Sequence, residues 1–134
     1  MDKYRHTVNY YETDRMGITH HSNYIRWMEE ARIDFLNQIG WGYDKMEEEG
    51  IISPVTSVNC KYKSPTTFPD DIFIEVFVEE IWGVRLKLKY VMKKADGTIA
   101  CEAGSEHCFM DSTGRIIRLE KTYPELYQLL YDLM

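Results

Sequence analysis

The stretch from Tyr10 to Tyr24 carries the side chains most able to do chemistry in this sequence of 134 residues. It contains the acid Asp14 and two adjacent histidines, and it runs through a glycine turn into the start of a helix. A carboxylate beside the unpaired amides of a helix start can activate water or attack an acyl group, while the amides stabilise the resulting oxyanion. The stretch therefore predicts an acyl-transfer site that uses no metal ion.

Asp14 is the expected catalytic carboxylate, either as a general base toward water or as a nucleophile. The amides around His21 and Ser22 are expected to bind the oxyanion. Tyr10, Tyr24 or the His21 side chain would then orient the aspartate or the water. Two alternatives stay open at this point. Asp14 can form an Asx turn or a helix cap instead, and His21 can simply hydrogen-bond to backbone where the helix begins.

The spacing of potential ligands and nucleophiles disfavours metal and thiol chemistry. His20 and His21 are neighbours whose side chains diverge on any regular element, and the dense ligand spacing of a dedicated metal site is missing. Cys108 directly follows His107, and neighbours on a strand point to opposite faces, so they cannot form a nucleophile–base pair. We expect no metal, no cofactor and inert thiols.

Composition narrows the class of protein further. A formal net charge of −6 argues against nucleic acid as a partner. Three cysteines without Cys-x-x-Cys spacing predict neither a disulfide framework nor a zinc site, and they indicate a reducing compartment. The sequence has no signal-peptide core and no run of about 20 apolar residues. We expect a cytoplasmic protein without a membrane span.

Hydrophobic periodicity predicts an α+β fold in one domain over residues 1–134. A broad apolar arc indicates one long helix over Asn23–Ile39, followed by Gly40. From Ile51 onward the period changes to two, which is typical of antiparallel strands. The expected strands are His6–Tyr11, Ser53–Lys63, Ile72–Ile81, Arg85–Lys94 and Thr98–Met110. The expected shorter helices are Tyr43–Glu49 and a C-terminal one, for which Thr122 and Glu125 have capping-box spacing.

Basic residues share one face of two of these strands. Arg85, Lys87 and Lys89 alternate with apolar residues on one strand, as Lys61 and Lys63 do on another. Such a face is ordinarily solvated, and lysines on an edge strand also discourage aggregation. The alternative is attraction of phosphate groups, which would agree with a substrate on a nucleotide-bearing acyl carrier.

Four motifs spread over nearly the whole chain form a specific combination. Val8–Gly17 reads VNYYETDRMG, and His21–Tyr24 (HSNY) and Arg26–Arg32 (RWMEEAR) follow it into the long helix. Cys60–Pro65 (CKYKSP) precedes an Asp-Asp pair. The combination resembles the hotdog-fold acyl-CoA thioesterases, in particular the 4-hydroxybenzoyl-CoA thioesterase branch.

This resemblance implies a five-stranded antiparallel sheet wrapped around the long helix, with active sites at the interface of a dimer that often pairs into a dimer of dimers. By position, Asp14 corresponds to the catalytic carboxylate and His21 to the residue whose amide polarises the thioester carbonyl. Tyr10 corresponds to a tyrosine of the first strand, and no catalytic role falls on Glu12. The expected substrate contacts are Gly17, Asn23, Tyr24, Lys61, Lys63, Ser64, Arg85 and Lys87.

We therefore expect hydrolysis of an acyl-CoA thioester to a free carboxylic acid and CoA, by a homodimer or homotetramer without a cofactor. A non-catalytic acyl-CoA or acyl-carrier binding module on the same fold is one alternative. A hotdog dehydratase acting on hydroxyacyl thioesters is another, and it would need a differently placed His/Asp pair. The acyl group itself is not predicted, because the pocket walls come from two subunits.

Overall fold

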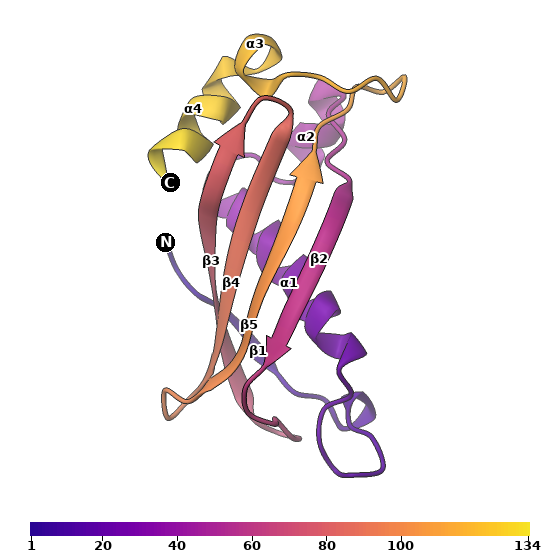
Figure 1. Ribbon diagram of the computed structural model, residues 1–134, viewed down its shortest axis with the longest axis vertical. Helices are drawn as coiled ribbons and strands as arrows, with labels where there is room; N and C mark the ends of the chain where they lie inside the picture. Colours follow the sequence, from indigo (N-terminus) through magenta and orange to yellow (C-terminus); the bar gives the residue numbers. More distant parts are fainter.

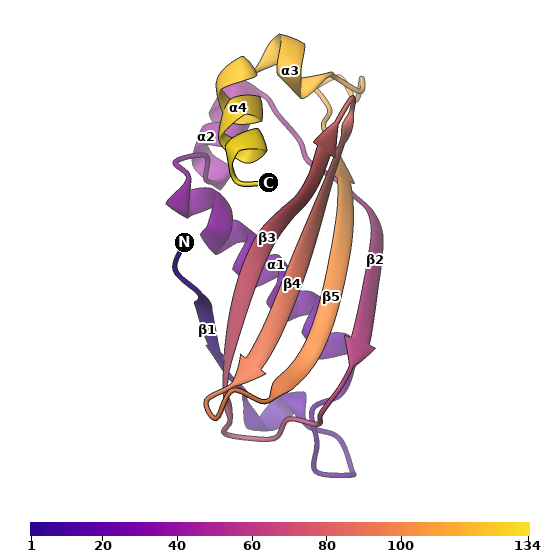
Figure 2. The same cartoon turned by 60° about the vertical axis from the view of Figure 1, so that its left-hand side comes forward.

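The long helix α1 (Ser22–Gln38) lies along one face of a five-stranded antiparallel sheet that curls around it (Figure 1, Figure 2). The computed structural model describes all 134 residues. Trp27, Met28, Ala31 and Phe35 are buried along the side of α1 that faces the sheet. Each large apolar side chain contributes about 1.5–3 kcal/mol when it is fully buried, so this stripe holds the helix in place.

The sheet has the spatial order β1-β3-β4-β5-β2, in which β3, β4 and β5 form a meander. On β4, Leu88 and Tyr90 are buried whereas Arg85 and Lys89 are exposed, which confirms the predicted apolar and basic faces of this strand. β2 forms one edge of the sheet. The strands are β1 (Tyr4–Thr7), β2 (Val55–Tyr62), β3 (Asp71–Trp82), β4 (Arg85–Lys94) and β5 (Ile99–Cys108).

Three short helices gather at the end of the sheet opposite the first turn of α1 (Figure 1). They are α2 (Tyr43–Glu49), α3 (Leu119–Thr122) and α4 (Pro124–Asp132). α4 buries Leu126 and Leu130 in the same core. None of the helices is both long and apolar enough to cross a membrane.

The first strand is shorter than predicted. The prediction covered His6–Tyr11, but β1 ends at Thr7 and Tyr10–Glu12 form a 3₁₀ helix. The carboxylate of Glu12 accepts a hydrogen bond from the backbone amide of Asn9 at 2.8 Å, which closes a turn that an extended strand cannot contain. Tyr10 therefore lies in a turn, and its predicted place on the first strand is wrong.

The C-terminal helix also begins differently from the prediction. The expected capping box of Thr122 and Glu125 does not form, because Thr122 ends α3 and α4 begins at Pro124. Proline suits the first position of a helix, since the N–H that it lacks would have no partner there. The other predicted elements are present, with shifts of one or two residues at their ends, and the predicted α+β architecture is confirmed.

Candidate active site

An open pocket of about 400 Å³ lies where the loop before α1, the first turn of α1 and the end of β2 meet. Figure 1 shows this loop and the arrowhead of β2 together at the lower end of the molecule. The pocket brings together five of the residues that the sequence predicted for the site. Its lining consists of Asp14, Met16, Ile18, Thr19, His21, Tyr24, Tyr62, Lys63, Ser64 and Pro65.

Asp14 opens a tight turn and presents a carboxylate to this pocket. Its backbone carbonyl accepts the Gly17 amide at 2.9 Å, its amide donates to the Ile18 carbonyl at 2.8 Å, and its Oδ1 accepts the Met16 amide at 2.8 Å. Gly17 has a φ of 78°, a left-handed conformation that glycine adopts without strain. Asp14 therefore forms an Asx turn through Oδ1. Its Oδ2 makes no hydrogen bond within the protein, so this oxygen is free to act on a water molecule or a substrate.

His21 lines the same pocket as Asp14, and its backbone amide is a free donor. The next two amides are occupied, because Ser22 donates to Nδ1 of His20 at 3.3 Å and Asn23 donates to the His20 carbonyl at 3.0 Å. The His21 amide makes no hydrogen bond in the protein. It stands directly before the 17-residue helix α1, whose positive end favours a developing negative charge.

Two tyrosines form an aromatic wall of the pocket. The Tyr24 and Tyr62 rings meet edge to face with centroids 5.1 Å apart. The Tyr24 hydroxyl lies 2.9 Å from Oγ1 of Thr66, and the Tyr62 hydroxyl donates to the His21 carbonyl at 3.4 Å. Burial raises the pKa of Tyr24, and burial together with Cys60 raises the pKa of Tyr62 to about 12. Both hydroxyls are therefore neutral at physiological pH, so neither serves as a base.

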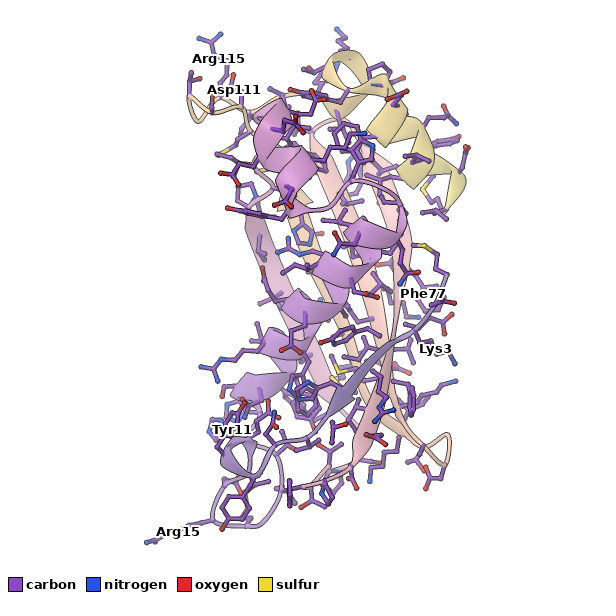
Figure 3. The ribbon with its side chains drawn as sticks, turned by 180° about the vertical axis from the view of Figure 1, so that it is seen from behind. Lys3, Tyr11, Arg15, Phe77, Asp111 and Arg115 are labelled. Carbon is purple, nitrogen blue, oxygen red and sulfur yellow. The ribbon has the colours of Figure 1, made fainter.

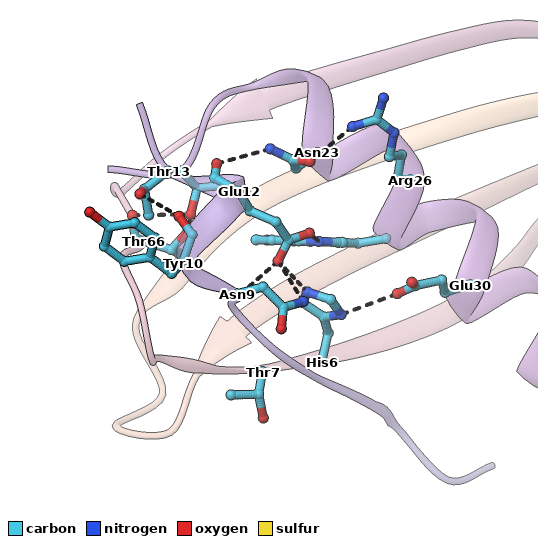
Figure 4. Close-up of polar contacts among 12 residues, drawn as sticks. His6, Thr7, Asn9, Tyr10, Glu12, Thr13, Asn23, Arg26, Glu30 and Thr66 are labelled. Carbon is cyan, nitrogen blue, oxygen red and sulfur yellow. Dashed lines mark hydrogen bonds and ion pairs between the residues drawn. The ribbon is translucent and has the colours of Figure 1, made fainter. Parts of the chain in front are cut away.

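The side chain of Glu12, to which the sequence assigned no role, holds the loop in place without lining the pocket. It is buried, and Figure 4 shows it bonded to His6 and Asn9. It also accepts a hydrogen bond from Nε1 of Trp27. Burial acts to raise the pKa of Glu12, but the hydrogen bonds from the Asn9 amide, His6 and Trp27 outweigh it and lower the pKa. The Asn9-x-x-Glu12 capping-box spacing was the signal in the sequence that could have indicated this turn.

Six predicted site residues lie outside the pocket lining, three of them between the first turn and the start of α1 and three on the strands. Tyr10 is 76% exposed and packs edge to face against Phe68. Asn23 points inward, where its Nδ2 donates to the carbonyls of Glu12 at 2.9 Å and His20 at 3.2 Å. Gly17 shapes the turn, as described above. The predicted catalytic role of Tyr10 and the predicted substrate contact of Asn23 stay predictions, since neither side chain lines this pocket.

The predicted basic residues divide between the two ends of the sheet. Lys63 lines the pocket, and its backbone donates to the Ala100 carbonyl. Lys61 is exposed on β2, outside the lining. Arg85 instead pairs with Cys108, eight residues further along β5 than Ala100, a separation of about 26 Å at about 3.3 Å per residue.

Lys87 lies near Arg85 and pairs with Glu79 at 3.8 Å. Figure 3 shows the length of the molecule, with Arg15 of the pocket loop at one end and Arg115, beyond β5, at the other. Within one chain, Arg85 and Lys87 therefore do not reach the pocket as substrate contacts. Strand alternation identified their face correctly but not their position along it.

Neither histidine of the loop belongs to a metal-binding group. The rings of His20 and His21 lie 4.3 Å apart, and Nδ1 of His20 is 2.8 Å from the Ser22 hydroxyl. No cluster of three or more histidine, cysteine or acidic side chains that could hold a metal ion occurs in the structure. The pocket lining combines the Asp14 carboxylate and the free His21 amide with the neutral hydroxyls of Tyr24 and Tyr62, and it also holds the side chains of His21, Lys63 and Ser64.

The sequence profile of the thioesterase-like superfamily matches residues 8–128 of this chain. The chain belongs to this superfamily. A candidate esterase of Aquifex aeolicus is 38% identical over 130 residues, which cover 96% of this chain and 97% of the relative. YneP of Bacillus subtilis, a candidate acyl-CoA thioesterase, is 32% identical over 119 residues, covering 88% of this chain and 86% of the relative.

Similarity to solved structures agrees with this assignment. A DHNA-CoA thioesterase from Staphylococcus aureus superposes with a TM-score of 0.91 at 32% sequence identity, covering 98% of this chain and 89% of that one. The predicted family, the hotdog fold and the predicted enzyme class, a thioester hydrolase, are confirmed.

Proposed function

We propose that this thioesterase hydrolyses an acyl-CoA thioester to the free carboxylic acid and CoA, with Asp14 as catalytic carboxylate and the His21 amide as oxyanion donor. One observation carries the assignment of the residues. The carboxylate with an unbonded oxygen and the free amide at the start of a 17-residue helix line the same pocket. Named relatives that act on CoA thioesters support the choice of substrate.

The amide and the carboxylate have complementary tasks in this reaction. The His21 N–H donates to the thioester oxygen and stabilises the negative charge that develops as the carbonyl carbon becomes tetrahedral. Asp14 takes a proton from the attacking water, or itself attacks and forms an anhydride that water then opens. In either case the carbon–sulfur bond breaks, CoA leaves as the thiolate and takes up a proton, and the acid is released.

We propose that a second copy of the chain completes the site. β2 is an edge strand with Val55, Val58 and Tyr62 exposed, which leaves it open to pairing with another β2. Antiparallel pairing about the strand centre would place the end of one β2, beside the pocket, next to the start of the other. There, an apolar pocket of about 520 Å³ lies between α1, α2 and Ile52, suited to an acyl group.

The proposed oligomer is a homodimer or a dimer of dimers, and its proposed location is the cytoplasm. Three free cysteines, two of them buried, support a reducing compartment. Lys63, at the mouth of the pocket, is the proposed contact for a CoA phosphate.

A substrate panel tests the reaction. Short, long and aromatic acyl-CoAs are incubated with the protein while free thiol is measured, and substrate depletion is followed by chromatography. We expect thiol release with the matching free acid for at least one acyl class. Saturable binding without thiol release would indicate a binding module instead, and accumulation of an enoyl thioester from a hydroxyacyl substrate would indicate a dehydratase.

A further inference from the structure

The buried side chain of Glu12 has hydrogen-bond partners on β1, in its own turn and on α1. Its side chain is only 6% exposed. Oε1 accepts from the Asn9 backbone amide at 2.8 Å and from Asn9 Nδ2 at 3.3 Å, and it lies 2.8 Å from His6 Nε2 (Figure 4). Oε2 accepts from Trp27 Nε1 at 2.8 Å. The two Asn9 groups and Trp27 Nε1 can only donate, so the site is built for a group that only accepts, a carboxylate.

His6 fixes this arrangement from the strand side. Its ring lies between two carboxylates, with Nε2 at 2.8 Å from Glu12 and Nδ1 at 3.2 Å from Glu30. The ring also packs on Trp27, with centroids 4.6 Å apart. β1, the 3₁₀ turn and α1 therefore meet at the Glu12 carboxylate.

The backbone of Glu12 connects the same residue to the oxyanion donor. The Glu12 carbonyl accepts from the His20 amide at 2.8 Å and from Asn23 Nδ2 at 2.9 Å. His20 directly precedes the free amide of His21, and Asp14 lies two residues beyond Glu12. The residue thus stands at the base of the loop that carries both reacting groups.

We propose that Glu12 is a positioning residue of the thioesterase reaction, because its buried carboxylate holds the loop so that Asp14 and the His21 amide keep their relative placement. This inference rests on the proposed function. Glu12 does not line the pocket, so it acts through Asp14 and His21 and not on the substrate. A displacement of about 1 Å between reacting groups can cost about a hundredfold in rate.

Glu12→Gln is the sharpest variant, because it keeps the shape of the side chain and replaces one acceptor by a donor. The new amide must face either Trp27 Nε1 or the Asn9 and His6 donors, and the loop shifts to relieve that clash. We expect kcat to fall by about tenfold to a hundredfold, with KM changed less than about twofold and rates measured well below the melting temperature of each protein. A lower kcat with an almost unchanged KM would show that the variant impairs the placement of the reacting groups and not the binding of the thioester.

Glu30→Gln is the matched control. It alters the other carboxylate on His6, but Glu30 has no bond to the loop, and the glutamine amide can still hydrogen-bond to Nδ1 of the His6 ring, as donor or as acceptor. We expect kcat to stay within about twofold of wild type. Equal losses in Glu12→Gln and Glu30→Gln, or a fully active Glu12→Gln enzyme, would overturn the proposal.

A double variant separates positioning from general destabilisation. Trp27→Phe removes the donor that opposes a glutamine amide, so Glu12→Gln combined with Trp27→Phe should be no slower than Trp27→Phe alone. If instead the double variant lost kcat by the sum of the two single effects on the activation free energy, a clash between the glutamine amide and Trp27 Nε1 would be contradicted.

Backbone amide hydrogen exchange gives a readout that does not depend on catalysis. We expect the amides of residues 13–21 to exchange faster in Glu12→Gln than in wild type, while those of β4 are unchanged. If wild type releases no thiol, the proposed function fails but the exchange result still tests the anchor. Unchanged exchange in this segment would refute the anchor even in an active enzyme.

Discussion

Only one of the two carboxylate oxygens of Asp14 has a partner in the protein, and this difference reconciles the structural and the catalytic interpretation of the residue. Oδ1 holds the turn through the Met16 amide, as in an ordinary Asx turn, while Oδ2 has no partner in the protein. A structural role and a chemical one are therefore carried by one side chain. The sequence could indicate both roles for Asp14. It could not show that the second oxygen stays free, because that depends on which residues the fold places next to it.

His107 is a second residue whose protonation matters, here for stability. It is buried, with Nδ1 accepting from Arg32 at 2.9 Å and Nε2 at 2.7 Å from the Ser105 hydroxyl. Burial, aided by Arg32, lowers the pKa of His107 to about 4. In the unfolded chain the same ring titrates near 6.5, so below that pH the unfolded state binds the additional proton.

Folding stability should therefore fall as the pH drops from about 6.5 toward about 4, by about 3 kcal/mol from this residue alone. Urea unfolding measured across this range in wild type and in His107→Gln checks the prediction. The variant lacks the titrating ring, so its stability should depend less steeply on pH. Identical pH slopes in the two proteins would show that His107 is not the titrating group.

At the scale of elements, the loop between the 3₁₀ turn and α1 depends on the left-handed backbone of Gly17. Gly17→Ala should cost about 1–2 kcal/mol of stability and slow thiol release, because the strained turn moves Asp14. Gly114, with a φ of 85° and free space around it as at Gly17, offers a control in a distant loop. Gly114→Ala should lose similar stability and keep full activity; equal rates in both variants would argue against this turn as a determinant of the site.

Elements with a clear hydrophobic period were predictable, and those set by a single local contact were not. The alternation of buried Leu88 and Tyr90 with basic residues located β4, and the apolar stripe around Trp27 located α1. By contrast, β1 stops early because the Glu12 carboxylate accepts from the Asn9 amide, and α4 begins at Pro124 instead of following Thr122. Such local contacts decide where these elements begin and end, although the hydrophobic pattern of the sequence is the same with or without them.

At the scale of the whole molecule, the position of a residue along its strand decides its role. Arg85 and Lys87 have the predicted face but lie at the other end of the sheet from Asp14, because β4 runs antiparallel to β5 and begins beside Cys108. Hydrophobic periodicity shows on which face of the sheet a side chain lies. Only the register of the five strands shows at which end of the sheet it lies.

The proposed dimer gives a prediction at this scale. Wild type should sediment at twice the chain mass of 15.9 kDa or more, and Val58→Lys should shift it toward the monomer and slow hydrolysis, since a lysine on an edge strand opposes pairing. Phe77→Lys is the control, because Phe77 on β3 has the same 40% exposure as Val58 but lies away from β2. A wild-type protein that is monomeric and fully active would exclude the composite site.

The most direct test of the proposed chemistry is thiol release by Asp14→Asn under saturating acyl-CoA. Asparagine keeps an oxygen that can accept the Met16 amide, so the turn, the fold and substrate binding should persist, as circular dichroism and KM would show. It cannot accept a proton or attack as a carboxylate does, and kcat should fall by about a hundredfold or more. A folded Asp14→Asn protein that turns over at the wild-type rate would contradict the central assignment.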